Sequence, residues 1–186
     1  MDNAPSFEIG LSDYAVHRLY PDDAEILQKL LEQCAYYVWI VEGEDVSPNA
    51  AEEIFKSAPP GRSLTDKFVF GLVNCQGAIT GVLEVTRNYP EENIWWMGLM
   101  LLTPAIRKQG IGRKFLESFS KYVQANDGLA IMGGIVEDNR LAYKFWLQAG
   151  FEVVRQTEPR QFGKKMQAVY VIRRAVNEQS YPLEKF

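Results

Sequence analysis

Arg107-Lys108-Gln109-Gly110-Ile111-Gly112 lies between two apolar patterns of different period. Before it runs Ile94-Trp95-Trp96-Met97-Gly98-Leu99-Met100-Leu101-Leu102, which is typical of a buried strand, and after it apolar residues recur at helical spacing. A strand, a glycine turn and a helix N-terminus in this order indicate an anion site, because the first N–H groups of a helix have no partner within it and point at a ligand. Glycine lets the backbone approach that ligand closely, and Arg113 extends the positive charge into the helix.

The spacing of the glycines excludes two nucleotide-binding loops. A P-loop requires Gly-x-x-x-x-Gly-Lys-Ser/Thr, which the chain lacks, and a dinucleotide fingerprint requires a third glycine where Phe115 stands. The stretch resembles instead the Arg/Gln-x-x-Gly-x-Gly/Ala signature of the GNAT superfamily of N-acetyltransferases, which holds the pyrophosphate of acetyl-CoA. The resemblance therefore implies acetyl-CoA as co-substrate, bound by Arg107, Lys108, Gln109, Gly110, Ile111, Gly112 and Arg113.

Two flanking motifs extend this resemblance over residues 94–151. Leu102-Thr103-Pro104 is similar to the family's exit from its fourth strand, and residues 139–151, with Asn139, Ala142, Trp146 and Gly150-Phe151, are similar to its later helix. The family's fourth and fifth strands splay apart around the pantetheine arm. By this resemblance the cofactor contacts the backbone of Met100 and Leu102 and the side chains of Asn139, Ala142, Tyr143 and Trp146.

A helical wheel places Asn139, Ala142, Tyr143 and Trp146 on one face, which we expect to line the cofactor groove. Leu141, Phe145 and Ala149 fall on the adjoining face, which we expect to face the core. A second interpretation of Asn139 is that it is a plain helix cap.

Two side chains are candidates for acid–base catalysis. Many family members carry a tyrosine four residues before Gly-Phe that protonates the departing thiolate, but Trp146 stands there, so Tyr143 is the candidate acid, or else a cofactor contact. The thiolate can equally leave unassisted or take a proton from the ammonium or from water. A base is required because an alkyl amine is mostly protonated at neutral pH. Glu84, on the preceding strand, is the nearest carboxylate by topology, unless it is an exposed strand residue.

The connection between the first two helices is expected to shape the acceptor site. Its aromatic and acidic residues Tyr37, Trp39 and Glu42 could hold a cation through ring faces and a carboxylate, and Trp96 could join them from the sheet. A second interpretation is that the aromatic residues belong to the core and that the acidic residues form a solvated loop.

Composition limits the class of protein. A chain of 186 residues fits one domain, 1–186, and a net charge of -4 argues against nucleic-acid binding. The longest apolar run, nine residues, is about half of a membrane span, and no export signal precedes it. Cys34 and Cys75 form neither a disulfide framework nor a metal motif, so we expect free thiols, a cytoplasmic location and no metal. A homodimer is left open.

Periodicity predicts strands over 14–19, 68–73, 78–86, 94–102, 129–136, 151–156 and 167–174. It predicts one long helix over 26–38, further helices over 47–56, 111–122 and 139–149, and a polar loop over 157–165. This order matches the α/β (α+β) GNAT fold, a mixed, mostly antiparallel twisted sheet of about seven strands with four flanking helices. The expected function is acetyl transfer to a primary amine of a small molecule by direct attack. Alternatives are a non-catalytic CoA-binding sensor or partner-binding module, and a protein N-terminal acetyltransferase.

Overall fold

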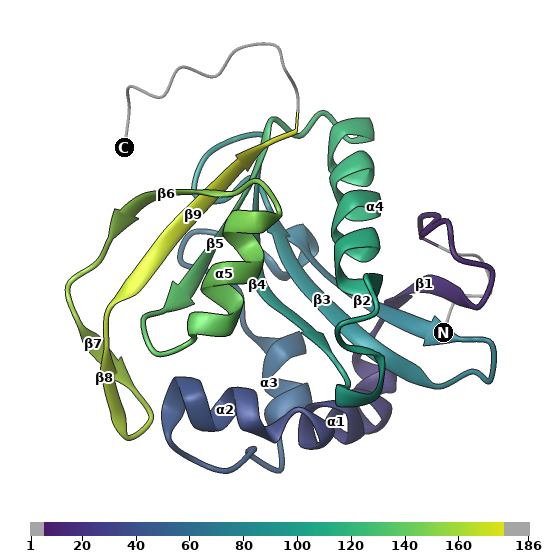
Figure 1. Cartoon of the computed structure of the whole chain (residues 1–186), viewed down its shortest axis with the longest axis horizontal. Helices are drawn as coiled ribbons and strands as arrows, with labels where there is room; N and C mark the ends of the chain where they lie inside the picture. The colour runs from purple at the N-terminus through teal and green to yellow at the C-terminus, as the bar shows by residue number, and fades with distance from the viewer. Residues whose placement is uncertain (1–5, 177–186) are drawn as a thin grey trace.

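A seven-stranded sheet organises residues 6–176, the part of the chain that the computed structural model describes (Figure 1). The strands lie in the order β1-β2-β3-β4-β5-β9-β6, and every neighbouring pair is antiparallel except β4–β5. Their bounds are β1 Tyr14–Leu19, β2 Lys67–Asn74, β3 Ile79–Arg87, β4 Ile94–Leu102, β5 Ala130–Val136, β6 Glu152–Gln156 and β9 Val169–Ala175. The predicted mixed, mostly antiparallel sheet is confirmed.

Helices cover both faces of this sheet. They are α1 Ala24–Gln33, α2 Ala35–Glu42, α3 Ala50–Lys56, α4 Ile111–Ala125 and α5 Arg140–Gln148. Successive residues of β2 point to opposite faces, so Phe70 packs in the cluster that contains Phe119 of α4, and Val69 packs with Leu30 of α1. The sheet is therefore the middle layer, and no helix of residues 6–176 is long and apolar enough to span a membrane.

The prediction of one helix over 26–38 was wrong. Cys34 has φ −102° and ψ 17°, which ends α1, and α2 starts at Ala35 in a new direction, so five α-helices replace the predicted four within residues 6–176. The Cys34 thiol is buried and donates to the Leu102 carbonyl at the end of β4, 3.4 Å away. Periodicity could not detect this break because apolar residues continue on both sides of it.

The predicted polar loop over 157–165 contains a short hairpin, β7 Arg160–Phe162 and β8 Lys165–Gln167. The Lys164 N–H donates to the carbonyl of Glu42 at the end of α2, 2.7 Å away. The Gln167 side chain donates to the Ile40 and Val41 carbonyls at 3.0 and 2.6 Å. The hairpin thus forms by packing on a segment more than a hundred residues earlier, which local sequence does not reveal.

Strands β4 and β5 separate half-way along their length. They pair from Ile94↔Ala130 to Met97↔Gly133, after which β4 continues to Leu102 without a partner on that side. The separation begins at Gly98, an extra residue in β4, since Val85 pairs with Met97 and Glu84 pairs with Leu99. Beyond it, the Thr103 N–H donates to Thr80 of the β3 side. Backbone groups alternate along a strand, so those of Met100 and Leu102 face the open side.

Candidate active site

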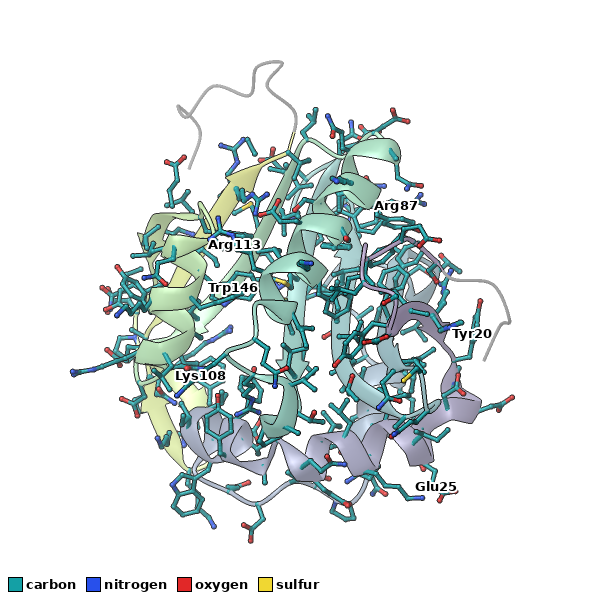
Figure 2. All side chains as sticks on the ribbon, turned by 45° about the vertical axis from the view of Figure 1, so that its right-hand side comes forward. Tyr20, Glu25, Arg87, Lys108, Arg113 and Trp146 are labelled. Carbon is teal, nitrogen blue, oxygen red and sulfur yellow. The ribbon has the colours of Figure 1, made fainter. Side chains whose placement is uncertain are left out.

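The loop between β4 and α4 has the conformation of an anion site. Lys108 and Gly110 have positive φ, 61° and 78°, and Gly110 is the N-cap of α4. Within residues 6–176, the backbone N–H groups of 108–113 donate to no protein acceptor. A Cβ added at Gly110 would meet nothing within 4 Å, so open space lies above these donors. Lys108 and Arg113 flank this end of α4 (Figure 2).

Three of the predicted loop side chains contact the protein itself. Arg107 donates through Nε to the Leu102 carbonyl at 2.8 Å and lies 4.6 Å over the Tyr36 ring. Gln109 donates to the Ala105 carbonyl at 2.8 Å, and Arg113 to the Gln148 carbonyl at 3.0 Å. These contacts fix the loop, and they leave its backbone as the part that is open to an anion.

Arg107 also reaches the helix break. Its guanidinium lies 3.6 Å from the Cys34 sulfur. Burial raises the pKa of the Cys34 thiol, and the neighbouring guanidinium opposes this rise. The thiol is therefore a buried neutral donor that ties α1 and α2 to the end of β4.

The helix over 140–148 presents the predicted faces only in part: Phe145 and Ala149 pack against the core as expected, and two other residues do not lie as expected. Leu141, expected to face the core, is 73% exposed, whereas Trp146, expected to look along the groove, is 8% exposed. The Trp146 ring makes edge-on contacts with the rings of Phe145 and Phe151, with ring centroids 4.9 and 5.1 Å away. Both faces of α5 carry apolar residues, so a helical wheel alone could not decide which one is buried.

The remaining residues of α5 lie as follows. Asn139 is the N-cap, accepting from the Ala142 N–H at 3.1 Å, so its interpretation as a cap is confirmed. The Tyr143 ring lies 4.9 Å from that of Tyr170 on β9. Contacts of Asn139, Ala142, Tyr143 and Trp146 with a cofactor stay predictions.

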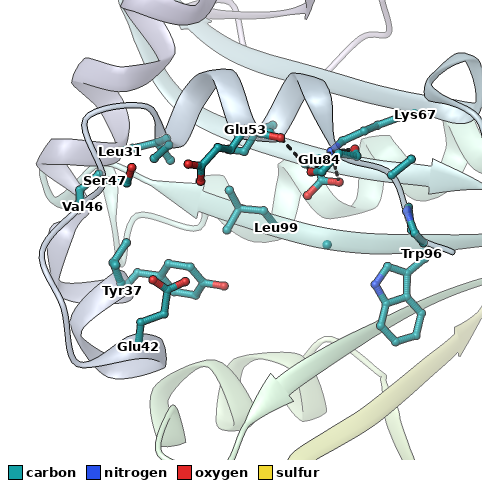
Figure 3. A pocket seen from close by; sticks show the side chains of 17 residues that line it. Leu31, Tyr37, Glu42, Val46, Ser47, Glu53, Lys67, Glu84, Trp96 and Leu99 are labelled. Atoms are coloured by element: carbon teal, nitrogen blue, oxygen red, sulfur yellow. Dashed lines mark hydrogen bonds and ion pairs between the residues drawn. The ribbon is translucent and has the colours of Figure 1, made fainter. Parts of the chain in front are cut away.

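A pocket of about 470 Å³ opens beside the bulge in β4 (Figure 3). Three of the four residues predicted for the acceptor, Tyr37, Glu42 and Trp96, line it, and so does the candidate base Glu84. Trp39 lies outside this pocket and is 60% exposed. The other lining residues come from α1, α2, α3, the loops beside α3, and strands β2 and β4: Leu31, Val38, Val46, Ser47, Ala50, Glu53, Ile54, Ser57, Ala58, Pro59, Lys67, Gly98 and Leu99.

Glu84 is held in this pocket by an ion pair. Lys67 Nζ lies 3.2 Å from Glu84 Oε1 and donates to the Ser57 carbonyl at 2.6 Å. The two side chains are only 6% and 16% exposed, so Glu84 is not the exposed strand residue of the second interpretation. A Cβ at Gly98 would lie 2.5 Å from Glu84 Oε2, so the carboxylate sits over β4 because Gly98 has no side chain. Sequence reasoning missed Lys67, and nothing local distinguishes it from a surface lysine.

Known proteins share the family and the fold of this chain. The family model described as an acetyltransferase (GNAT) domain matches residues 18–171. The chain belongs to the GNAT acetyltransferase family. Among curated proteins, none matches this GNAT protein.

Solved structures share its fold. An acetyltransferase from Thermus thermophilus is 20% identical with a TM-score of 0.67, covering 88% of this chain and 97% of its own. A spermidine N-acetyltransferase from Vibrio cholerae, solved with CoA and spermine, is 14% identical with a TM-score of 0.68, covering 89% and 96%. A Salmonella typhimurium protein solved with its cofactor acetyl-CoA is 16% identical with a TM-score of 0.65, covering 92% and 98%. At these identities the likeness concerns the fold.

Burial and neighbouring carboxylates raise the pKa of two side chains that line the pocket of this GNAT protein, Tyr37 and Glu42. Burial raises the pKa of Tyr37 to about 12, assisted by the negative charge of Glu84 and Glu42. The Tyr37 phenol therefore keeps its proton at neutral pH. Burial also raises the pKa of Glu42, and repulsion from Glu44 and Glu53 adds to the rise.

No group of three or more His, Cys, Asp or Glu side chains within residues 6–176 could hold a metal ion.

The raised pKa of Glu42 predicts a pH-dependent stability effect. A carboxyl whose pKa is higher in the folded state than in the unfolded state disfavours folding once it is ionised, so its contribution falls as pH rises through the folded pKa. We therefore expect Glu42→Gln to raise the melting temperature at neutral pH. The gain in the free energy of unfolding should be less than about 1 kcal/mol, because the site is partly solvated. The gain should vanish in acid, below the ordinary carboxyl range. Glu158→Gln, at an exposed position, is the control; an equal gain there, or a loss in Glu42→Gln, contradicts the assignment.

Proposed function

We propose that this protein transfers the acetyl group of acetyl-CoA to a primary amine of a small molecule by direct attack, without an acyl-enzyme. One observation carries the proposal: the pocket that contains Glu84 is lined by Gly98 and Leu99, at the point where β4 leaves β5. The next residue, Met100, turns its backbone to the open side of β4. An acceptor in the pocket and a thioester along β4 would thus meet at the bulge.

The loop 107–113 fits the pyrophosphate of acetyl-CoA. Its free N–H groups lie at the positive end of the α4 dipole, and the space above Gly110 is open. Two structural neighbours were solved with CoA or acetyl-CoA, which supports the same co-substrate here. The Leu102 carbonyl already accepts from Arg107, so we assign the pantetheine arm to the backbone of Met100 and to the Leu102 N–H.

Each step of the transfer has a candidate group. Glu84 takes a proton from the acceptor ammonium, and Lys67 keeps that carboxylate in place. The free amine then forms the N–C bond, and the Met100 N–H stabilises negative charge on the thioester oxygen. The C–S bond breaks, the nitrogen of the new amide loses its second proton to water, and the CoA thiolate takes a proton from water. The described cysteines, Cys34 and Cys75, are free thiols, which suits a cytoplasmic location.

Substitution of Tyr143 tests whether its phenol protonates the CoA thiolate. Because its ring packs against Tyr170, we expect Tyr143→Phe to retain kcat and to change the acetyl-CoA KM by only a few fold, as for one lost hydrogen bond. Tyr170→Phe removes a hydroxyl from the other member of the ring pair and is the matched control. A hundredfold fall in kcat at unchanged KM, confined to Tyr143→Phe, would make Tyr143 the general acid instead.

Acceptor-dependent release of the CoA thiol tests the proposed function. A protein that binds CoA but releases no thiol with any amine would be the non-catalytic binding module. The volume of the pocket, about 470 Å³, favours a small acceptor over a protein N-terminus.

A further inference from the structure

The pocket beside β4 carries more negative charge than acetyl transfer to a simple amine requires. Its charged lining consists of Glu42, Glu53, Glu84 and Lys67. Lys67 pairs with Glu84, which leaves Glu42 and Glu53 facing the pocket. Across residues 6–176, neither of these two carboxylates has a hydrogen-bond or ion-pair partner.

The unpaired carboxylates lie apart from the bulge. In Figure 3, Glu42 lies beside Tyr37, whereas the Lys67–Glu84 pair lies on the side of Trp96. Glu53 projects from α3 above Leu99, between these two sides. Burial raises the pKa of Glu42, and repulsion from Glu44 and then from Glu53 adds to the rise, so the Glu42 and Glu53 carboxylates lie within electrostatic reach of one another. A ligand that reaches both regions therefore meets one negative charge at the bulge, balanced by Lys67, and two unbalanced charges farther away.

The surface between these regions is apolar. Leu31, Val46, Ile54 and Leu99 line the pocket with the ring of Trp96. Methylene groups of a ligand would lose contact with water there, which is favourable for an aliphatic chain. Glu42 is half-buried and Glu53 is exposed beside this apolar surface, and both carboxylates attract a cation and repel an anion.

We propose that the acceptor is an aliphatic diamine: one amine lies at Glu84 beside Gly98, and the second, as an ammonium, lies between Glu42 and Glu53. This inference rests on the proposed function, since it assigns the reacting amine to the same pocket. The Glu42 backbone is fixed for this role, because its carbonyl accepts from the Lys164 N–H of the β7–β8 hairpin at 2.7 Å. A monoamine would leave both carboxylates unpaired, and an amino acid would bring its own carboxylate against them.

Three probes of similar length test the inference on the full chain. Putrescine carries two amines, pentylamine replaces the second amine by a methyl group, and γ-aminobutyrate replaces the terminal CH2–NH2 group by a carboxylate. We expect kcat/KM for putrescine to exceed that for pentylamine roughly tenfold to a hundredfold, as for one charge-assisted contact, and γ-aminobutyrate to be poorer still. Calorimetric binding of each probe to the CoA complex is measured in parallel, so that recognition is read even without turnover.

Matched double variants show which carboxylates cause the preference for putrescine over pentylamine. Glu42→Gln/Glu53→Gln should reduce the ratio of kcat/KM for putrescine to kcat/KM for pentylamine to within a few fold. Glu25→Gln/Glu52→Gln removes the same charge from exposed positions outside the pocket lining, where Glu25 pairs with Lys29 and Glu52 with Lys56, and should keep the preference.

Equal kcat/KM and equal binding of putrescine and pentylamine in the wild type would overturn the inference. So would a putrescine preference that survives Glu42→Gln/Glu53→Gln. Tighter binding of putrescine without release of CoA thiol would support this recognition site and overturn the proposed transfer, so the two failures are distinguishable.

Discussion

Gly110→Asp is expected to weaken CoA binding by on the order of a hundredfold or more and to leave the fold intact. The variant places a carboxylate where the pyrophosphate must approach the free N–H groups of 108–113. It adds like charge and fills the open space above Gly110 at the same time. Isothermal titration with CoA measures the affinity, and thermal unfolding measures the fold.

Gly77→Asp is the matched control for this variant. Gly77 has φ +79° in the turn between β2 and β3, against φ +78° at Gly110, and a Cβ at either position meets nothing within 4 Å. The two variants therefore carry the same backbone strain and the same added charge. We expect both to lose similar stability and only Gly110→Asp to lose CoA. Unchanged CoA affinity in Gly110→Asp, or an equal loss in both, would remove the loop from the cofactor site.

Glu84→Gln is expected to reduce kcat roughly 10²- to 10⁴-fold, the usual contribution of a general base. The loss should shrink as pH rises toward the acceptor's own pKa, about 10.4 for an alkyl amine, because free amine then forms without a base. Acetyl-CoA affinity should stay unchanged, since Glu84 lines the acceptor pocket. A pH–rate profile with saturating acetyl-CoA measures the effect.

The effect of Glu84→Gln on stability has to be separated from its effect on catalysis. Glu84→Gln leaves Lys67 buried without a counter-charge, which is destabilising, whereas replacing both members of a buried pair is often neutral. Lys67→Met/Glu84→Gln should therefore recover stability while kcat stays low and rises with pH. If kcat recovers together with stability, Glu84 is a structural residue and the base is elsewhere.

The sequence was most informative where function depends on local order. The path from β4 through Gly110 into α4 combines a change of period with glycines of positive φ, so the strand, the turn and the helix were all predictable. Tyr37, Glu42 and Trp96 were found because aromatic and acidic residues concentrate near the first helices and in β4, and all three line the pocket.

The rest depends on contacts between distant segments. The role of Lys67 depends on Glu84, which pairing of β2 with β3 brings beside it, and on Ser57, which follows α3. Trp39 and Tyr37 lie two residues apart on α2, a helix with apolar residues on every side, so their different exposure could not be predicted. Gln167 ends its strand as an ordinary polar residue, yet its buried amide links the Val41 carbonyl to the Asp138 N–H.

The central claim is acetyl transfer to an amine in the pocket beside Gly98. The most direct measurement is acceptor-dependent release of the CoA thiol, with mass spectrometry of the acceptor, on the wild type and on Gly110→Asp and Glu84→Gln. For the wild type we expect released thiol and an acceptor heavier by one acetyl group, in equal amounts. We expect both to be lost in each variant. CoA binding without acceptor-dependent release, across an amine panel that includes putrescine and pentylamine, would contradict it.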